Sequence, residues 1–210
     1  MKSSTASLIV SIWCLFILFK VEGQGRPDTV KLRNNYNTLK NLLSTDSANL
    51  DLLLDLAQTS RKLSNADEAL LYLNQIKDLD SLHLEARSLE AYVLRDQGEL
   101  QKSFDLWLRV GEEINQLPNA ERIHYDLALL AMKLERYEVG ISSLEKAIAL
   151  DDTKANYFLN LGVCRARSKR LKEGCSDWKR AHELGATQAE ALIRKYCPVT
   201  CKELFTNCED

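Results

Sequence analysis

The chain carries one arrangement of small and large apolar positions that recurs every 34 residues. Four segments share it, residues 50–83, 84–117, 121–154 and 155–188, and only residues 118–120 interrupt the run. The eighth and twentieth places of each segment hold small residues: Ala57 and Ala69, Ala91 and Ser103, Ala128 and Gly140, Gly162 and Gly174. The twenty-fourth and twenty-seventh places are apolar: Leu73 and Ile76, Trp107 and Val110, Leu144 and Ala147, Trp178 and Ala181. Such a constant phase over four segments indicates a repeat protein.

These columns predict that each segment is a pair of antiparallel helices. Two helices approach closely only where their side chains are small, and a large residue then fills the space beside that contact. Turn-forming residues stand midway along three segments, at Ser64-Asn65, Gln97-Gly98 and Lys169-Arg170. The 210 residues include only three prolines and eight glycines, so helices can run with few interruptions. The sequence therefore predicts an all-α fold of helix hairpins.

This pattern resembles the tetratricopeptide repeat (TPR) family, and the likeness covers residues 50–188. The resemblance implies a right-handed superhelical solenoid in which the first helix of each hairpin lines the concave side. Two features depart from the family pattern. The thirty-second place lacks proline, and the fourth place lacks tryptophan and holds Leu53, Arg87, His124 and Phe158 instead.

Flanking segments extend the repeats at both ends. Residues 24–49, with Tyr36, Leu39, Leu42 and Leu43 on one face, are expected to contain the second helix of a truncated first repeat. Residues 187–196 are expected to form a capping helix, because a terminal repeat would otherwise expose its stacking face. A cysteine-containing tail then continues to residue 210.

The first 23 residues have the pattern of a secretory signal peptide. Lys2 supplies a positive start, Leu8 to Phe19 form an apolar run of about a dozen residues, and Val21-Glu22-Gly23 suit a cleavage site before Gln24. An uncleaved membrane anchor is the alternative, but the apolar run is short for a bilayer. We therefore expect an exported protein, periplasmic or extracellular, with a Gram-negative cell envelope as the suspected source.

The net charge argues against nucleic-acid partners, and the charge pattern gives little support to binding of an anionic surface. The formal net charge is −2, whereas a nucleic-acid binder normally needs a basic face to displace counterions from phosphates. The basic stretch at 165–172 could touch an anionic surface, but acidic neighbours favour a solvated helix face. We expect protein partners and no nucleic acid, with membrane contact only peripheral if any.

Cysteines cluster at the end of the chain. One of the six, Cys14, lies in the expected signal peptide, and the other five are Cys164, Cys175, Cys197, Cys201 and Cys208. Clustered cysteines of exported proteins usually pair, and an odd number leaves at least one thiol free. Cys164 could pair with Cys175 across one hairpin. The spacing of Cys197 and Cys201 would also suit zinc, although no histidine lies nearby.

A second resemblance implies one particular pairing. The stretch Gly174-Cys175-Ser176-Asp177-Trp178, followed by Lys195-Tyr196-Cys197, resembles the terminal repeat of envelope TPR proteins of the Bacteroidetes group. That likeness implies a disulfide between Cys175 and Cys197 that ties the capping helix to the last repeat. Cys201 and Cys208 would then close a small tail loop and leave Cys164 buried and free.

The TPR likeness places a candidate groove on the first helices. The groove positions hold Leu54, Gln58 and Arg61; Ser88, Tyr92 and Arg95; Tyr125, Leu129 and Met132; Leu159, Val163 and Arg167. An aromatic and aliphatic centre with arginines toward each end suits an extended or helical peptide that carries carboxylates. The alternative interpretation is that Tyr92, Tyr125 and Met132 pack between neighbouring hairpins, because such residues also fill cores.

No catalytic constellation is present in the sequence. The histidines are His83, His124 and His182, and none lies at helical spacing from another; His124 is expected to be buried. Nucleophile elbows, phosphate loops and metalloprotease motifs do not occur. We therefore expect a binding scaffold that is not an enzyme and uses no metal, cofactor or small-molecule substrate. An accessory enzyme or a thiol-redox protein working through Cys201 and Cys208 is the alternative.

Overall fold

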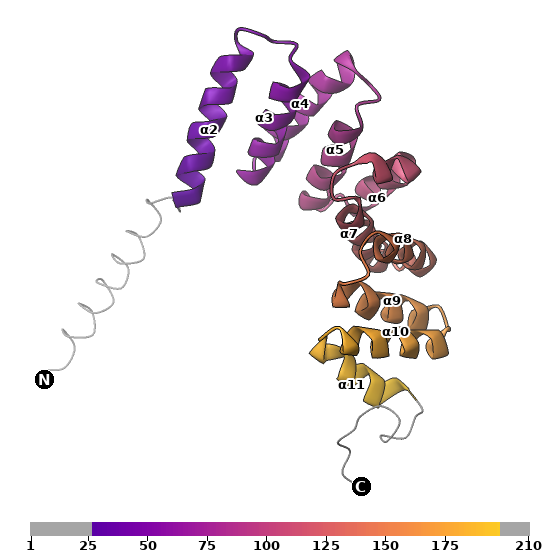
Figure 1. The fold of residues 1–210 in the computed structure, drawn as a ribbon. Coiled ribbons are helices and arrows are strands. Elements are labelled where there is room, and N and C mark those ends of the chain that lie inside the picture. The colour runs from indigo at the N-terminus through magenta and orange to yellow at the C-terminus, as the bar shows by residue number, and fades with distance from the viewer. Residues whose placement is uncertain (1–26, 198–210) are drawn as a thin grey trace, which may run out of the picture. The chain divides into compact units, whose positions relative to one another are not determined.

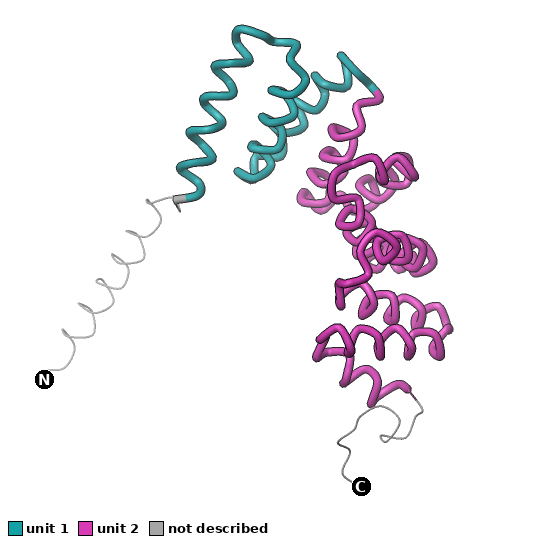
Figure 2. The backbone as a smooth tube through the Cα atoms, in the orientation of Figure 1, with its two compact units in different colours: residues 1–81 teal, residues 82–210 magenta. Residues whose placement is uncertain are grey.

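The computed structural model describes residues 27–197, which fall into two compact units. Figure 2 colours the first, residues 1–81, teal and the second, residues 82–210, magenta. Within the described range the chain forms ten α-helices and one 3-10 helix and no strand, so the all-α prediction is confirmed (Figure 1). No helix in that range is both long and apolar enough to span a membrane. The expected signal peptide and tail cysteines lie outside it.

The first unit consists of a hairpin and one preceding helix. Helix α2 (Pro27–Leu43) precedes α3 (Leu50–Lys62) and α4 (Ala66–Leu79), which form the first hairpin. Asn49 and Asn65 begin the two hairpin helices, since each side chain accepts a bond from a backbone N–H in the first turn. The α2 helix contributes Tyr36, whose hydroxyl lies 2.9 Å from that of Tyr72 and also donates to the Glu68 carboxylate.

The second unit stacks three hairpins and a final helix. The hairpins are formed by α5 (Leu84–Asp96) with α6 (Leu100–Val110), α7 (Ala120–Lys133) with α8 (Tyr137–Leu150), and α9 (Ala155–Arg167) with α10 (Leu171–Glu183). Helix α11 (Thr187–Tyr196) packs on α10. The four predicted columns are buried in every repeat, as the hairpin interpretation requires.

The last hairpin shows why the small columns are needed. A Cβ placed on Gly174 would lie 2.7 Å from the carbonyl oxygen of Gly162, and one on Gly162 would lie 2.8 Å from that of Gly174. The two helix backbones are therefore in direct contact. Trp178 fills the space beside them, is 2% exposed, and donates its indole N–H to the Leu159 carbonyl at 3.1 Å.

One turn geometry closes all four hairpins. The fifteenth place of each repeat has a left-handed backbone, with φ of 60° at Ser64, 84° at Gly98, 58° at Glu135 and 64° at Lys169. The next N–H then bonds back five residues, as in Arg136 to the Ala131 carbonyl at 2.8 Å. Three of these turns were predicted, and the one at Glu135 was missed.

The second repeat departs from the predicted uniform hairpin. Its second helix ends at Val110, and a 3-10 helix, η1 (Gly111–Gln116), follows before α7 begins at Ala120, inside the expected interruption. The turn places Ile114 in the core at 1% exposure. His124 is buried, as expected, and its Nε2 lies 2.8 Å from Asn115 Oδ1. Burial, followed by the charge of Lys146, lowers the pKa of His124.

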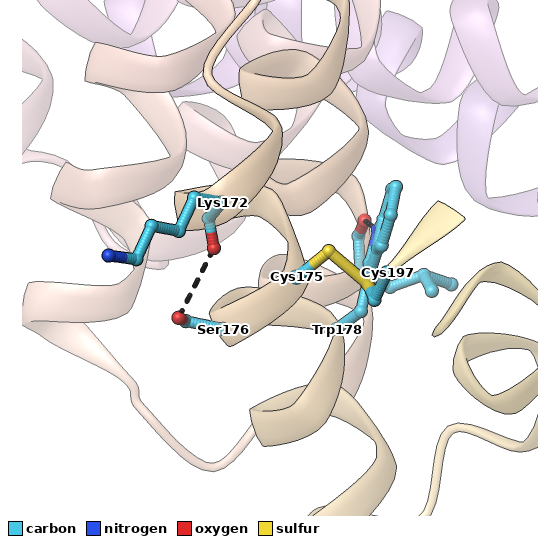
Figure 3. Close-up of a disulfide and its surroundings, with 6 residues drawn as sticks. Lys172, Cys175, Ser176, Trp178 and Cys197 are labelled. Atoms are coloured by element: carbon cyan, nitrogen blue, oxygen red, sulfur yellow. Dashed lines mark hydrogen bonds between the residues drawn. A yellow bond between two sulfur atoms is a disulfide. The ribbon is translucent and has the colours of Figure 1, made fainter. Parts of the chain in front are cut away.

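A disulfide joins the terminal helix to the last hairpin. Cys175 of α10 bonds to Cys197 directly after α11 (Figure 3), and this is the pair implied by the resemblance. Cys164 is buried and free. The alternative pairing of Cys164 with Cys175 is therefore wrong. Ala189 and Ile193 of α11 are buried at 0% and 1% exposure, so α11 covers the end of the last repeat. No group of metal ligands occurs in residues 27–197.

Candidate functional site

The first helices of the second unit carry eight of the expected groove residues. We call this surface the first-helix face; its residues are Tyr92 and Arg95 of α5, Tyr125, Leu129 and Met132 of α7, and Leu159, Val163 and Arg167 of α9. All except the exposed Arg167 are half-buried. Five of them pack against the buried clusters of the hairpins, namely Tyr92, Tyr125, Met132, Leu159 and Val163.

Tyr92 connects α5 to the next repeat. Its ring packs edge-on against Trp107 with centroids 5.1 Å apart, and its hydroxyl donates to Asp126 Oδ2 of α7 at 3.0 Å. Burial, and then the negative charge of Asp126, raise the pKa of Tyr92. The phenol therefore remains protonated at neutral pH and acts as a fixed hydrogen-bond donor.

The Asp126 carboxylate interacts with two arginines. Its carboxylate is buried and accepts from Arg122 Nε at 3.3 Å, and it lies 3.8 Å from Arg95 Nη1. The Arg95 guanidinium also stacks over the Tyr92 ring, 4.9 Å from its centroid. Arg95, which the sequence suggested would meet a partner's carboxylate, is thus held by Asp126 and by its neighbour Asp96.

Tyr125 connects α7 to the last hairpin in a similar way. Its ring lies 4.8 Å from that of Tyr157, and its hydroxyl accepts from Asn160 Nδ2 of α9 at 3.0 Å. Burial is the main cause that raises the pKa of Tyr125. Both the groove interpretation and the packing interpretation therefore apply to Tyr92 and Tyr125. Their rings pack between neighbouring hairpins, and each side chain is only half-buried.

A cleft of about 380 Å³ opens beside Tyr125 and Tyr157. It lies between α7, the α8–α9 turn and the α10–α11 turn, all in the second unit. Its walls are formed by Arg122, Tyr125, Thr153, Lys154, Ala155, Asn156, Tyr157, Leu184, Gly185, Ala186 and Gln188. The cleft is thus lined by aromatic rings, two cationic side chains and backbone from two turns.

The remaining expected groove residues have different surroundings. Leu159 and Val163 pack against the core around Trp178. Ser88 is buried at 6% exposure, so the expectation that it lines the groove is wrong. Leu54, Gln58 and Arg61 lie on α3 of the first unit, where Gln58 is exposed and the other two are half-buried.

Four residues of the site were not among the predicted groove positions: Arg122, Asp126, Tyr157 and Asn160. Asp126 and Asn160 occupy the sixth place of consecutive repeats, and each bonds to the tyrosine of the preceding first helix. A polar residue at one repeat place beside a preceding tyrosine was a readable signal. The repeat pattern places breaks near the two turns that close the cleft, but helical periodicity does not describe the geometry of turns and so gave no sign of the cleft.

A second buried carboxylate lies on the last hairpin, outside the cleft. Asp177 of α10 accepts from Arg165 at 2.8 and 3.0 Å. Burial outweighs the attraction of Arg165 and raises the pKa of Asp177 to about 6. This pair ties α9 to α10.

Comparison with known proteins shows the fold. No family model matches the chain, and no curated protein matches it either. The structure is similar to a solved MamA protein, with a TM-score of 0.62 and 19% identity, covering 81% of this chain and 88% of that one. It is similar to MamA 41-end from Desulfovibrio magneticus RS-1, with a TM-score of 0.61 and 19% identity, covering 78% and 98% of the two chains.

A further structural neighbour is YrrB, described as a TPR protein with an unusual peptide-binding site. The TM-score is 0.64 at 18% identity, with 72% of this chain and 77% of that chain covered. The order of the helices, the geometry of the hairpin turns and the similarity to these solved structures all indicate the same fold. The chain has the all-α solenoid fold of tetratricopeptide repeat proteins.

Proposed function

We propose that this protein is a scaffold that binds a peptide segment of a partner protein along the first-helix face, and that it performs no chemistry on that partner. The observation that carries the proposal is a row of two half-buried tyrosines, Tyr92 and Tyr125, which Asp126 and Asn160 fix in place, with Tyr125 lining a cleft of about 380 Å³. Rigid aromatic side chains give a large contact area at a low cost in conformational entropy. A pre-ordered row of this kind suits an extended peptide.

Three further considerations support binding over catalysis. YrrB, a neighbour of the same fold, is described as having a peptide-binding site. The ionisable phenols of Tyr92 and Tyr125 have raised pKa values, which suits hydrogen bonding and does not suit a nucleophile or a general base. The buried free thiol of Cys164 has its pKa raised to about 12 by burial, which makes it unreactive.

We further propose that the protein is exported. The pattern of residues 1–23 and a disulfide in the last repeat both suit an oxidising compartment. Sequencing the mature N-terminus tests this point: a chain that starts near Gln24 supports export, and a chain that retains residues 1–23 in the cytoplasm rejects it.

A blocking substitution tests the peptide site without removing any packing. Gln188 is exposed on the cleft wall, so Gln188→Trp fills the cleft while the tyrosines stay in place. Fluorescein-labelled pools of random ten-residue peptides are titrated by anisotropy against wild type and variant. We expect Gln188→Trp to weaken binding about tenfold.

The matched control is Gln101→Trp, which adds the same ring to the exposed surface of α6. It should bind the peptide pools as wild type does, and both variants should melt as wild type does. Pools that bind Gln188→Trp as tightly as wild type would reject the cleft as the peptide site. Pools that do not bind wild type at all would reject the proposed function.

A further inference from the structure

A second and smaller pocket, of about 100 Å³, opens where the second repeat departs from the pattern of the others. Its lining residues come from α6, η1, α7 and α8, and none of them lines the cleft described above. Helix α6 ends at Val110, and Gly111 turns the chain with φ of 53° and ψ of −125°, a conformation that favours glycine. The 3-10 helix η1 therefore forms one wall of this space, which we call the second-helix pocket.

The floor of the second-helix pocket is apolar and belongs to the core. Trp107 and Ile114 are each 1% exposed, and Leu127 is 5% exposed. Tyr92 packs edge-on against Trp107, with ring centroids 5.1 Å apart, and so holds the indole in one orientation. A ring that enters the pocket meets a fixed aromatic surface, and aromatic pairs contribute more than their buried area alone.

One buried polar side chain on the pocket wall lacks a partner. Ser143 of α8 is 4% exposed, and among residues 27–197 its hydroxyl makes no hydrogen bond. A buried hydroxyl without a partner costs free energy, which a bound donor or acceptor would recover. Ser143 can therefore bond to one polar group of a ligand.

The charges around the pocket are already balanced. Lys146 lines it and donates to Glu112 at 2.5 Å. His124 also lines it, and its Nε2 lies 2.8 Å from Asn115 Oδ1. Burial, followed by the charge of Lys146, lowers the pKa of His124, so the imidazole is neutral at pH 7. A charged ligand would lose its hydration here without gaining an unpaired counter-charge, so the pocket favours an uncharged molecule.

We infer that the second-helix pocket binds a small uncharged aromatic alcohol, whose ring packs on Trp107 and whose hydroxyl bonds to Ser143. Size limits the ligand: a closed apolar cavity of roughly 150 Å³ holds benzene, so an open pocket of about 100 Å³ admits one six-membered ring and little more. This site goes beyond the proposed peptide function, because it is formed by other residues and needs no peptide.

Phenol and toluene test the inference, because both carry one aromatic ring and only phenol carries a hydroxyl. The isotope-labelled full chain is titrated with each compound, and nuclear magnetic resonance follows the Trp107 indole N–H and the amides of residues 111–114. We expect phenol to bind about fivefold more tightly than toluene, as one neutral hydrogen bond predicts. Equal affinities would overturn the inference, as would the absence of shifts at these signals.

A substitution at the edge of the pocket blocks it without removing any packing. Ser142 is exposed and lines the pocket, so Ser142→Trp should weaken phenol binding by about tenfold or more. Ser176 occupies the same place of the next repeat, is exposed on α10 and does not line the pocket. Ser176→Trp is therefore the matched control and should bind phenol as wild type does. Phenol that binds Ser142→Trp as tightly as wild type would overturn the assigned location.

A second variant, Ser143→Ala, separates the contribution of the hydroxyl bond from that of the ring. Because the Ser143 hydroxyl makes no hydrogen bond within the described part of the chain, this variant should fold as wild type does, which circular dichroism checks. It should bind toluene as wild type does and phenol about fivefold more weakly. A variant that keeps the full preference for phenol would overturn the role of Ser143, and the inference with it.

Discussion

Single residues with a left-handed backbone set the length of every hairpin. Gly98 adopts this conformation without strain, whereas Ser64, Glu135 and Lys169 carry a Cβ at the same place. For residues other than glycine the left-handed region costs about 1 kcal/mol or more. The repeats therefore differ in turn strain although their turns share one geometry.

This difference predicts opposite effects from two substitutions. Gly98→Ala should lower the free energy of unfolding by about 1 kcal/mol, because a Cβ there meets no neighbour within 4 Å and only the backbone is strained. Glu135→Gly should raise it by up to about 1 kcal/mol, reduced by the greater entropy of unfolded glycine. Urea unfolding followed by circular dichroism measures both. A Gly98→Ala protein as stable as wild type would contradict the shared turn geometry.

Prediction from sequence succeeded for residues that obey the repeat and failed for those that do not. The small and large columns, such as Gly162 and Trp178, were readable because close helix contact imposes them in every repeat. Glu135 was missed because glutamate is not a turn former, and the hairpin itself imposes its conformation. Asp126 was missed because a carboxylate on a helix face is ordinarily solvated, so the repeat place that it shares with Asn160 was not weighed; the structure shows Tyr92 and Arg122 converging on it.

At the scale of elements, helix α11 is the part whose attachment is most open to test. It packs on α10 through Ala189 and Ile193, its Tyr196 ring lies 6.0 Å from Trp178, and the Cys175–Cys197 bond fixes its end. Because α11 also carries Gln188 at the cleft, its attachment bears on the proposed site.

Removing the disulfide should loosen this helix. A disulfide between residues 22 apart stabilises the folded state by roughly 3 kcal/mol, because it lowers the conformational entropy of the unfolded chain. Cys197→Ser should lower the free energy of unfolding by about that amount and speed amide hydrogen exchange in α11 more than in α7. Wild type in reductant should match the variant in reductant. A reductant-insensitive wild type would show that this bond does not form.

The second repeat marks the limit of element prediction. Its four columns follow the pattern, yet α6 ends at Val110 and η1 inserts Ile114 into the core. The three extra residues before the third repeat give the chain room for this turn. Periodicity predicted that an interruption exists and gave no geometry for it. The same reason explains why the cleft, which two turns close, could not be predicted.

For the whole molecule, the fold follows from the sequence further than the site does. Repeated columns determined the all-α hairpin architecture in both units. They also placed Tyr92 and Tyr125 on the correct helices, but they gave no sign of the cleft or of its two cations. The proposed function makes a claim about location, namely that a peptide would bind the first helices of the second unit while the second helices act as support.

The most direct test of that claim is a map of amide chemical shifts by nuclear magnetic resonance, recorded as the tightest-binding random-peptide pool is added to the isotope-labelled chain. We predict shifts concentrated in α5, α7 and α9 and in the turns at residues 151–154 and 184–186. Shifts concentrated in α6, α8 and α10 would contradict the claim.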